Sequence, residues 1–244
     1  MDTPRGNLGA VLRHYYKNGE KQRAFKIATD ELRRNEDHGE MHEVLGLLHY
    51  LELHIDQAIH HLETACTLLP LNSRSQIALA NCYIERDFGK AASAIFEHLV
   101  TLPDLPSDLF PDLAKGFARL GDYHNARQAC EAAIERMPDC EKAWFGLVFY
   151  MTRCSYPCSK VISVMRKVVS LAPKSIDYRM VIANLCDQIG YTAEAEDHLL
   201  AIDPNDILNQ GSGCCIRRLK DLAQRLQVAT VVEFCDIRLT KLRE

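Results

Sequence analysis

The sequence predicts an all-α solenoid built from helix–turn–helix units, on three observations. Prolines recur at Pro70, Pro103, Pro138 and Pro173, which are 33, 35 and 35 residues apart. Ahead of each proline, small and aromatic residues recur at fixed offsets. The turn expected inside each block is polar and often contains glycine. A period near 34 is typical of stacked helix pairs, because one pair buries its apolar face only against its neighbours.

Six blocks follow this period from Arg5 onward, and each predicts two antiparallel helices. They span residues 5–38, 39–72, 73–106, 107–140, 141–175 and 176–207. Small residues share one position in the first helix of a block and another in the second, where they allow close helix approach. In the first helix these are Gly46, Ala80, Ala114 and Ala183. In the second helix they are Ala24, Ala58, Ala92, Ala126 and Ala195.

The turn within a block is expected at Asn18-Gly19, Phe88-Gly89, Gly121-Asp122 and Gly190-Tyr191, because glycine accepts the left-handed backbone that ends a helix. The fifth block departs from this pattern, with one extra residue in the segment 154–158. The sixth block has its proline, Pro204, about three residues early, so we expect a short second helix there.

The residues after the sixth block predict a different segment. Residues 208–213 contain Gly211-Ser212-Gly213 and are expected to be a linker. Residues 214–228 predict an amphipathic helix, and residues 229–242 a second one. We expect 214–244 to cap the exposed end of the solenoid, since a terminal repeat lacks a neighbour. The alternative is a docking helix for a partner.

The recurring residues resemble the tetratricopeptide repeat (TPR) family over roughly residues 5–207. Leu45-Gly46, Ala58, Ala65 and Pro70 follow that family's pattern in the second block, and Leu113-Ala114, Phe117, Ala126 and Pro138 follow it in the fourth. The resemblance implies a right-handed superhelical solenoid of about six TPR-like helix pairs with a C-terminal capping segment. It also implies a concave groove lined by the first helix of each pair.

Composition and charge narrow the function classes. The net charge is −4, with 22 basic and 29 acidic residues in 1–213 and 7 basic and 4 acidic in 214–244. An acidic body argues against a nucleic-acid partner, which needs a basic surface. No apolar run of 18 residues or more occurs, so we expect no membrane span. With no secretory signal, we expect a cytoplasmic protein.

The ten cysteines and ten histidines do not predict a catalytic or metal site. Cys66, Cys82, Cys130 and Cys186 occupy helix positions where small buried residues are expected. His49 occupies an aromatic position of the repeat and is expected to be a packed core residue, whereas His60 and His61 are expected to face outward. Nucleophile, phosphate-loop and zinc-protease motifs are absent. We therefore expect no enzyme, no cofactor and no metal.

The resemblance places candidate partner-binding residues along the groove. The apolar ones are Leu47, Tyr50, Ile77, Ile84, Phe145 and Phe149, and exposed aromatic or aliphatic patches tend to mark binding sites. The polar ones, suited to holding a peptide backbone, are Arg74, Asn81, Lys115, Arg119 and Asn184. Alternatively, the tail or neighbouring repeats cover Phe145 and Phe149.

The expected function is a non-catalytic protein–protein interaction module or scaffold that binds a peptide or helix of a partner in its concave groove. The clamp with which some family members hold chaperone C-termini is present only in fragments, such as Arg74 and Asn81. Two alternatives remain open: a structural subunit of a larger assembly, as a complex subunit or homo-oligomer, and a regulatory arm of a transferase-type enzyme.

Overall fold

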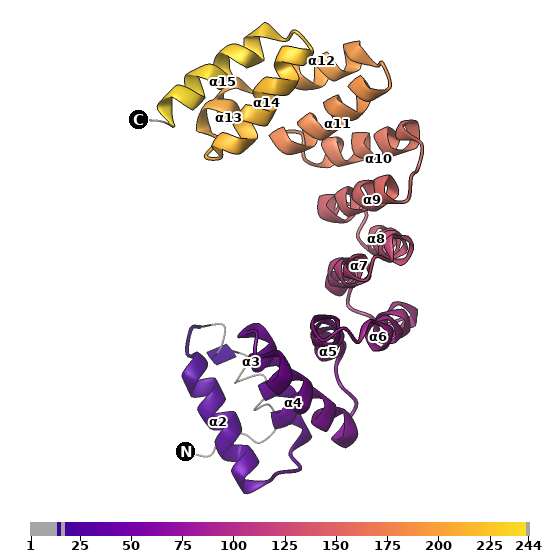
Figure 1. Cartoon of the computed structure of the whole chain (residues 1–244), viewed down its shortest axis with the longest axis vertical. Helices are drawn as coiled ribbons and strands as arrows, with labels where there is room; N and C mark the ends of the chain where they lie inside the picture. The colour runs from indigo at the N-terminus through magenta and orange to yellow at the C-terminus, as the bar shows by residue number, and fades with distance from the viewer. Residues whose placement is uncertain (1–13, 16–17, 243–244) are drawn as a thin grey trace. The chain divides into compact units, whose positions relative to one another are not determined.

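The structure is a computed structural model that describes residues 14–15 and 18–242 (Figure 1). The chain divides into two compact units, Met1–Ala129 and Cys130–Glu244. Over the described residues every regular element is a helix: fourteen α-helices and one short 3-10 helix. The all-α prediction is therefore confirmed.

The first unit contains helix pairs joined by short turns (Figure 1). Its helices are α2 (Lys21–Arg34), α3 (Gly39–Leu51), α4 (Ile55–Leu68), α5 (Ser73–Glu85), α6 (Gly89–Thr101), the 3-10 helix η1 (Ser107–Leu109) and α7 (Phe110–Arg119). Helix α8 (Tyr123–Arg136) contains the boundary between the two units.

The second unit continues the pattern and ends with two helices beyond the predicted repeats. Its helices are α9 (Glu141–Arg153), α10 (Cys158–Leu171), α11 (Ile176–Gln188), α12 (Thr192–Leu200), α13 (Pro204–Asn209), α14 (Gly213–Arg225) and α15 (Ala229–Lys241). Helix α12 has nine residues, so the second helix of the sixth block is short, as expected.

One turn geometry recurs inside every pair. A residue with positive φ lies at positions 19, 53, 87, 121, 155, 190 and 227, which are 34, 34, 34, 34, 35 and 37 residues apart. In each turn the next backbone N–H donates to the carbonyl five residues before it, over 2.8–3.0 Å. This is the Schellman helix ending, which satisfies carbonyls that the helix leaves unpaired. The repeat is thus defined by its turns as much as by its core.

Four of the seven left-handed positions carry a side chain, although glycine is favoured there. They are Leu53, Asp87, Ser155 and Gln227, with φ of 57–61°. The turn expected at Phe88-Gly89 is therefore wrong in detail. Asp87 takes the left-handed conformation, and Gly89 is the first residue of α6.

The four periodic prolines lie two residues after a helix end, following α4, α6, α8 and α10. Since proline cannot continue the preceding helix, each one separates one pair from the next. Pro204 differs, because it is the first residue of α13.

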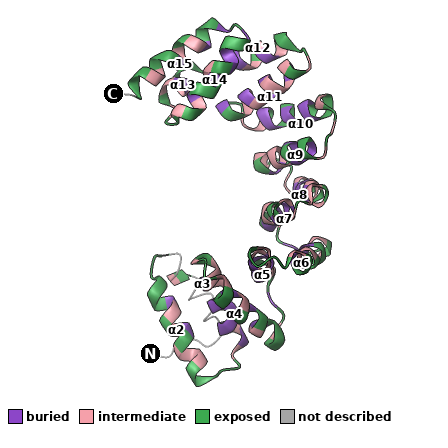
Figure 2. Ribbon diagram, viewed as in Figure 1, coloured by how far each residue is buried: buried purple, intermediate pink, exposed green. Residues whose placement is uncertain are grey.

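The small residues of the repeat lie where the helices meet. Ala24, Ala58, Ala92, Ala126 and Ala195 are completely buried. Gly46 faces Leu62 of α4 so closely that a Cβ on Gly46 would lie 2.5 Å from Leu62 Cγ. Figure 2 shows the buried residues interleaved with exposed ones along each helix, as amphipathic packing requires.

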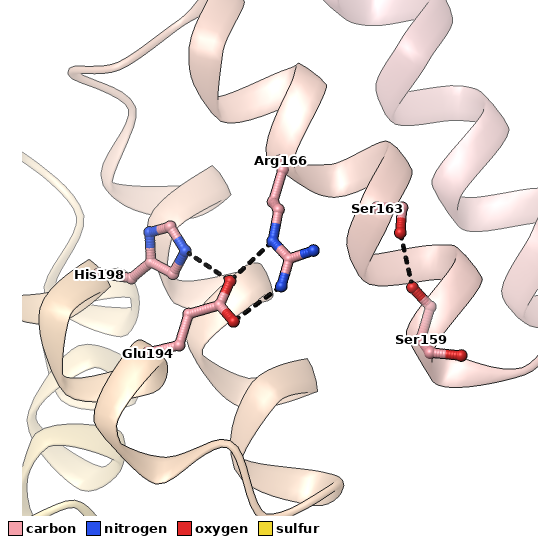
Figure 3. Close-up of polar contacts among 5 residues, drawn as sticks. All are labelled: Ser159, Ser163, Arg166, Glu194 and His198. Carbon is pink, nitrogen blue, oxygen red and sulfur yellow. Dashed lines mark hydrogen bonds and ion pairs between the residues drawn. The ribbon is translucent and has the colours of Figure 1, made fainter.

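A charged clamp joins two neighbouring pairs of the second unit (Figure 3). Arg166 of α10 donates from Nε and Nη2 to the two carboxylate oxygens of Glu194 in α12, over 2.9 and 2.8 Å. Arg166 holds the pKa of Glu194 below its usual value. His198 lies one turn further along α12, with Nε2 3.7 Å from Glu194 Oε1. Two parallel bonds of this kind fix orientation better than a single contact does.

The predicted linker, residues 208–213, is shorter than expected. Residues 208 and 209 belong to α13, in which Ile207 is buried, and α14 already begins at Gly213. The intervening Gln210 is held by Arg238 of α15, whose Nε donates to its carbonyl over 2.7 Å. Glycine and serine in the sequence thus mark a helix start, where the Ser212 hydroxyl accepts from the backbone of Cys215.

Candidate functional site

A hollow of about 710 Å³ lies in the first unit between α3, α5 and α7. Seven of the eleven predicted groove residues line it: Leu47, Tyr50, Arg74, Ile77, Asn81, Lys115 and Arg119. They come from the first helices of three successive pairs, as the resemblance implies.

The wall contributed by α3 is apolar, whereas α5 and α7 supply the charged groups of this hollow. Arg74 pairs with Asp108, and Lys115 Nζ lies 3.6 Å from Asp112. Arg119 donates to Asn81 Oδ1 over 2.9 Å and to Glu85 over 2.5 Å. Each of these cations has an acidic neighbour and is exposed, so such pairs contribute little stability and can be exchanged.

Tyr50 is half-buried at the apolar wall, and burial raises the pKa of its hydroxyl. It therefore stays neutral across the physiological range.

Two sequence expectations for the first unit need correction. Ile77 lines the hollow but is buried, with only 5% of its surface exposed. Ile84 does not line the hollow, since it lies near the end of α5. Glu43 is also buried: its Oε1 accepts from the backbone N–H and side chain of Asn72, over 3.0 and 2.6 Å, at the start of α5.

A second hollow, of about 540 Å³, lies in the second unit between α9, α11 and α14. The remaining three predicted residues, Phe145, Phe149 and Asn184, line it. Phe149 is 51% exposed, whereas Phe145 is half-buried, with its ring centroid 4.8 Å from that of Tyr178. Neither Phe145 nor Phe149 is fully buried, and neither is fully exposed to solvent.

Sequence reasoning missed the wall that α14 contributes to this second hollow. Arg218, Asp221, Leu222 and Arg225 line it, although this segment was expected to be a cap or a docking helix and not a wall of the groove. Arg225 Nε lies 2.9 Å from Asp187, and its Nη2 donates to Asn184 Oδ1 over 2.8 Å. These bonds tie α14 to α11.

The histidines cluster between α3 and α4. His42 is buried, its Nε2 lies 2.9 Å from the Glu36 carbonyl, and its Nδ1 lies 3.0 Å from His61 Nδ1. The His61 ring stacks on His49, with centroids 5.5 Å apart. Burial lowers the pKa of His61 to about 4, helped by the nearby His42 and His49. His49 is a packed residue as expected, but His61 is a packing and hydrogen-bonding residue and not an outward-facing one.

The cysteines follow the expectation except at one position. Cys82, Cys130 and Cys186 are buried, but Cys66 is exposed. Among the described residues, no three or more His, Cys, Asp or Glu side chains are grouped as metal ligands. None of the helices described is long and apolar enough to cross a membrane.

The repeat is also found by comparison with known proteins. Residues 112–148 match the model of the tetratricopeptide repeat. The C-terminal part of a TPR repeat-containing protein from Cytophaga hutchinsonii superposes with a TM-score of 0.71, at 12% identity, over 96% of this chain and 95% of that one. The chain is a tetratricopeptide repeat protein. TPR proteins are generally protein-interaction scaffolds and typically non-catalytic, and no catalytic domain is evident among the residues that the structure describes.

Two further relatives share parts of this TPR chain. YrrB, a TPR protein with an unusual peptide-binding site, superposes with a TM-score of 0.58 at 16% identity, over 71% of this chain and 89% of YrrB. General transcription factor 3C polypeptide 3 from Homo sapiens is 27% identical over 130 residues, which are 50% of this chain and 14% of that protein. The TPR chain thus matches a small part of a much longer relative, and the solved structures establish its fold alone.

Proposed function

We propose that this TPR protein is a non-catalytic scaffold that binds a peptide or helix of a partner protein in the hollow between α9, α11 and α14. The observation that carries the proposal is Phe149, an aromatic ring half exposed inside a hollow lined by apolar and charged side chains of three helices. Binding energy at protein interfaces concentrates on aromatic anchors in such depressions.

The hollow between α3, α5 and α7 supports a second contact site for the same partner class. Leu51 lines it with 53% of its surface exposed, beside the half-buried Leu47 and Tyr50. The peptide-binding site named for YrrB is in keeping with this reading, since YrrB shares the fold.

Affinity capture from the cells that naturally make the protein tests the proposal. The wild type is compared with Phe149→Ala and with the control Tyr191→Ala, which removes an equally exposed aromatic ring outside the hollow. Partners lost only with Phe149→Ala support groove binding. Partners retained equally by all three proteins contradict it and favour the alternative of a structural subunit that assembles through other surfaces.

A further inference from the structure

The hollow between α9, α11 and α14 is lined by more basic than acidic residues, although the chain as a whole is acidic. The chain carries a net charge of −4, yet the charged residues that line this hollow are three arginines and one aspartate. A basic depression attracts negatively charged ligands and repels positively charged ones. It therefore speeds the association of acidic ligands and favours them over others in the complex.

The basic groups come mainly from α14. Arg225 is fixed by its bonds to Asp187 and Asn184, and its side chain is still 56% exposed. Arg218 is exposed, and among the described residues no hydrogen bond or ion pair engages it. Asp221 is the one acidic residue of the lining and lies on the same helix. Arg225 is therefore held in place, and Arg218 is available to bind a ligand.

The wall that α9 contributes is mainly apolar, and its one charged residue is the third arginine, Arg153. Phe149 of α9 is half exposed, and Phe145 is backed by Tyr178. The floor from α11 is mostly apolar, with Met180, Val181 and Leu185. Apolar side chains on α9 and α11 beside the two arginines of α14 match a ligand with a bulky apolar side chain next to a carboxylate.

We propose that the hollow between α9, α11 and α14 receives an acidic segment of a partner protein, in which a bulky apolar side chain contacts Phe149 and neighbouring carboxylates contact Arg218 and Arg225. This inference rests on the proposed function, because it specifies the ligand of the same hollow. It makes α14 a selectivity element in addition to an end helix. Aspartate and glutamate side chains supply the carboxylates that an arginine guanidinium binds in bidentate fashion.

Selection from a displayed library of random peptides of about 12 residues tests this. The full-length wild type is the bait, and peptides also retained by Phe149→Ala are removed. The content of Asp and Glu among the remaining peptides is compared with the input library. The selection is repeated with Arg218→Glu and with its matched control Arg217→Glu, which reverses an exposed charge one position away, outside the hollow.

The proposal predicts Phe149-dependent peptides that combine Leu, Phe or Tyr with Asp or Glu. It predicts that Arg218→Glu weakens them about five- to tenfold and removes the acidic bias, while Arg217→Glu keeps it. Phe149-dependent peptides without an acidic bias, or a bias that survives Arg218→Glu, would overturn the inference and leave the proposed function standing. Absence of any Phe149-dependent peptide would overturn both.

A labelled single-stranded DNA of similar length is the counter-probe, because basic and aromatic side chains together also bind nucleic acids. The proposal expects no displacement of a selected peptide by this DNA. If the DNA displaces the peptide from the wild type but not from Arg218→Glu, the hollow binds nucleic acid and the inference is refuted.

Discussion

Replacement of Leu53 by glycine is predicted to stabilise the first unit. Leu53 occupies the left-handed turn between α3 and α4 with φ of 61°, and its side chain is 78% exposed. A residue with a Cβ pays about 1–2 kcal/mol in that conformation. Glycine removes this strain but has a more flexible unfolded chain, which costs about 0.4–1 kcal/mol. Since the exposed leucine makes few contacts, the net gain is about 0.5–1 kcal/mol.

Urea unfolding followed by far-ultraviolet circular dichroism measures the effect. With a slope of about 2 kcal/mol per molar urea, the midpoint should rise by about 0.3–0.5 M. Leu53→Ala is the control, because it removes the leucine side chain but keeps the Cβ in the left-handed turn. The only tryptophan, Trp144, lies in the second unit, so its fluorescence follows that unit separately. Equal midpoints for Leu53→Gly and Leu53→Ala, or a lower one for glycine, would refute the reasoning.

Four further outcomes follow from the structure. Gly121→Ala, at the equivalent turn with φ of 79°, should lower the free energy of unfolding by about 1 kcal/mol in the same urea assay, and an unchanged midpoint would contradict this. Gly46→Ala should also lower the free energy of unfolding by about 1 kcal/mol, because the clash with Leu62 outweighs alanine's helix preference. This holds although Ala80, Ala114 and Ala183 occupy the corresponding position in other pairs. A higher free energy of unfolding would contradict the prediction and show that α4 can move away. Stability should fall as pH drops from about 6.5 to about 4, since the unfolded chain binds the proton that folded His61 excludes. Because the His61 ring is partly exposed to solvent, the free energy of unfolding should fall by only about 1–2 kcal/mol over this pH range. His61→Gln should make the free energy of unfolding less dependent on pH between about 6.5 and about 4. Deleting residues 213–244 removes α15, against which α13 packs, and should lower the melting temperature or cause aggregation, measured by calorimetry and light scattering. Unchanged melting would contradict a capping role for this segment.

The repeat could be predicted from sequence because its determinants are local. Alanines at the helix contacts and prolines two residues past the helix ends recur at a fixed period, and the structure has both where the pattern indicates. Glycines also identified three of the seven left-handed turns, at Gly19, Gly121 and Gly190. The other four were hidden, because the Schellman hydrogen bond forms with any residue that tolerates the strain.

The last pair shows why the site was only half predicted. Helices α14 and α15 close with the same turn as the repeats, at Gln227, with the Val228 N–H donating to the Ala223 carbonyl over 2.8 Å. Lys220 and Val232 stand at the positions where earlier pairs have small residues, so the pattern is lost there. Leu219, which shares the position of Leu45 and Leu113, was the one remaining signal. A side wall made by α14 could not be foreseen without recognising this pair.

Burial of individual groove residues depends on packing between pairs, which the period alone does not set. Ile77 faces the hollow but is almost covered, whereas Phe149 at the corresponding face of α9 is half exposed. The carboxylate of Glu43, on α3, is likewise buried and accepts two hydrogen bonds from Asn72 at the start of α5. Such details follow from neighbouring side chains that a single sequence does not place.

The central claim is tested most directly by the dissociation constant of one peptide selected on the wild type alone, before the peptides retained by Phe149→Ala are removed. Fluorescence anisotropy would compare the wild type, Phe149→Ala and Tyr191→Ala. We predict binding about thirtyfold or more weaker for Phe149→Ala, because loss of an aromatic anchor typically costs about 2 kcal/mol or more. Binding by Tyr191→Ala should stay within about twofold of the wild type. Equal dissociation constants for all three proteins, with each variant folded as judged by circular dichroism, would contradict a binding site between α9, α11 and α14.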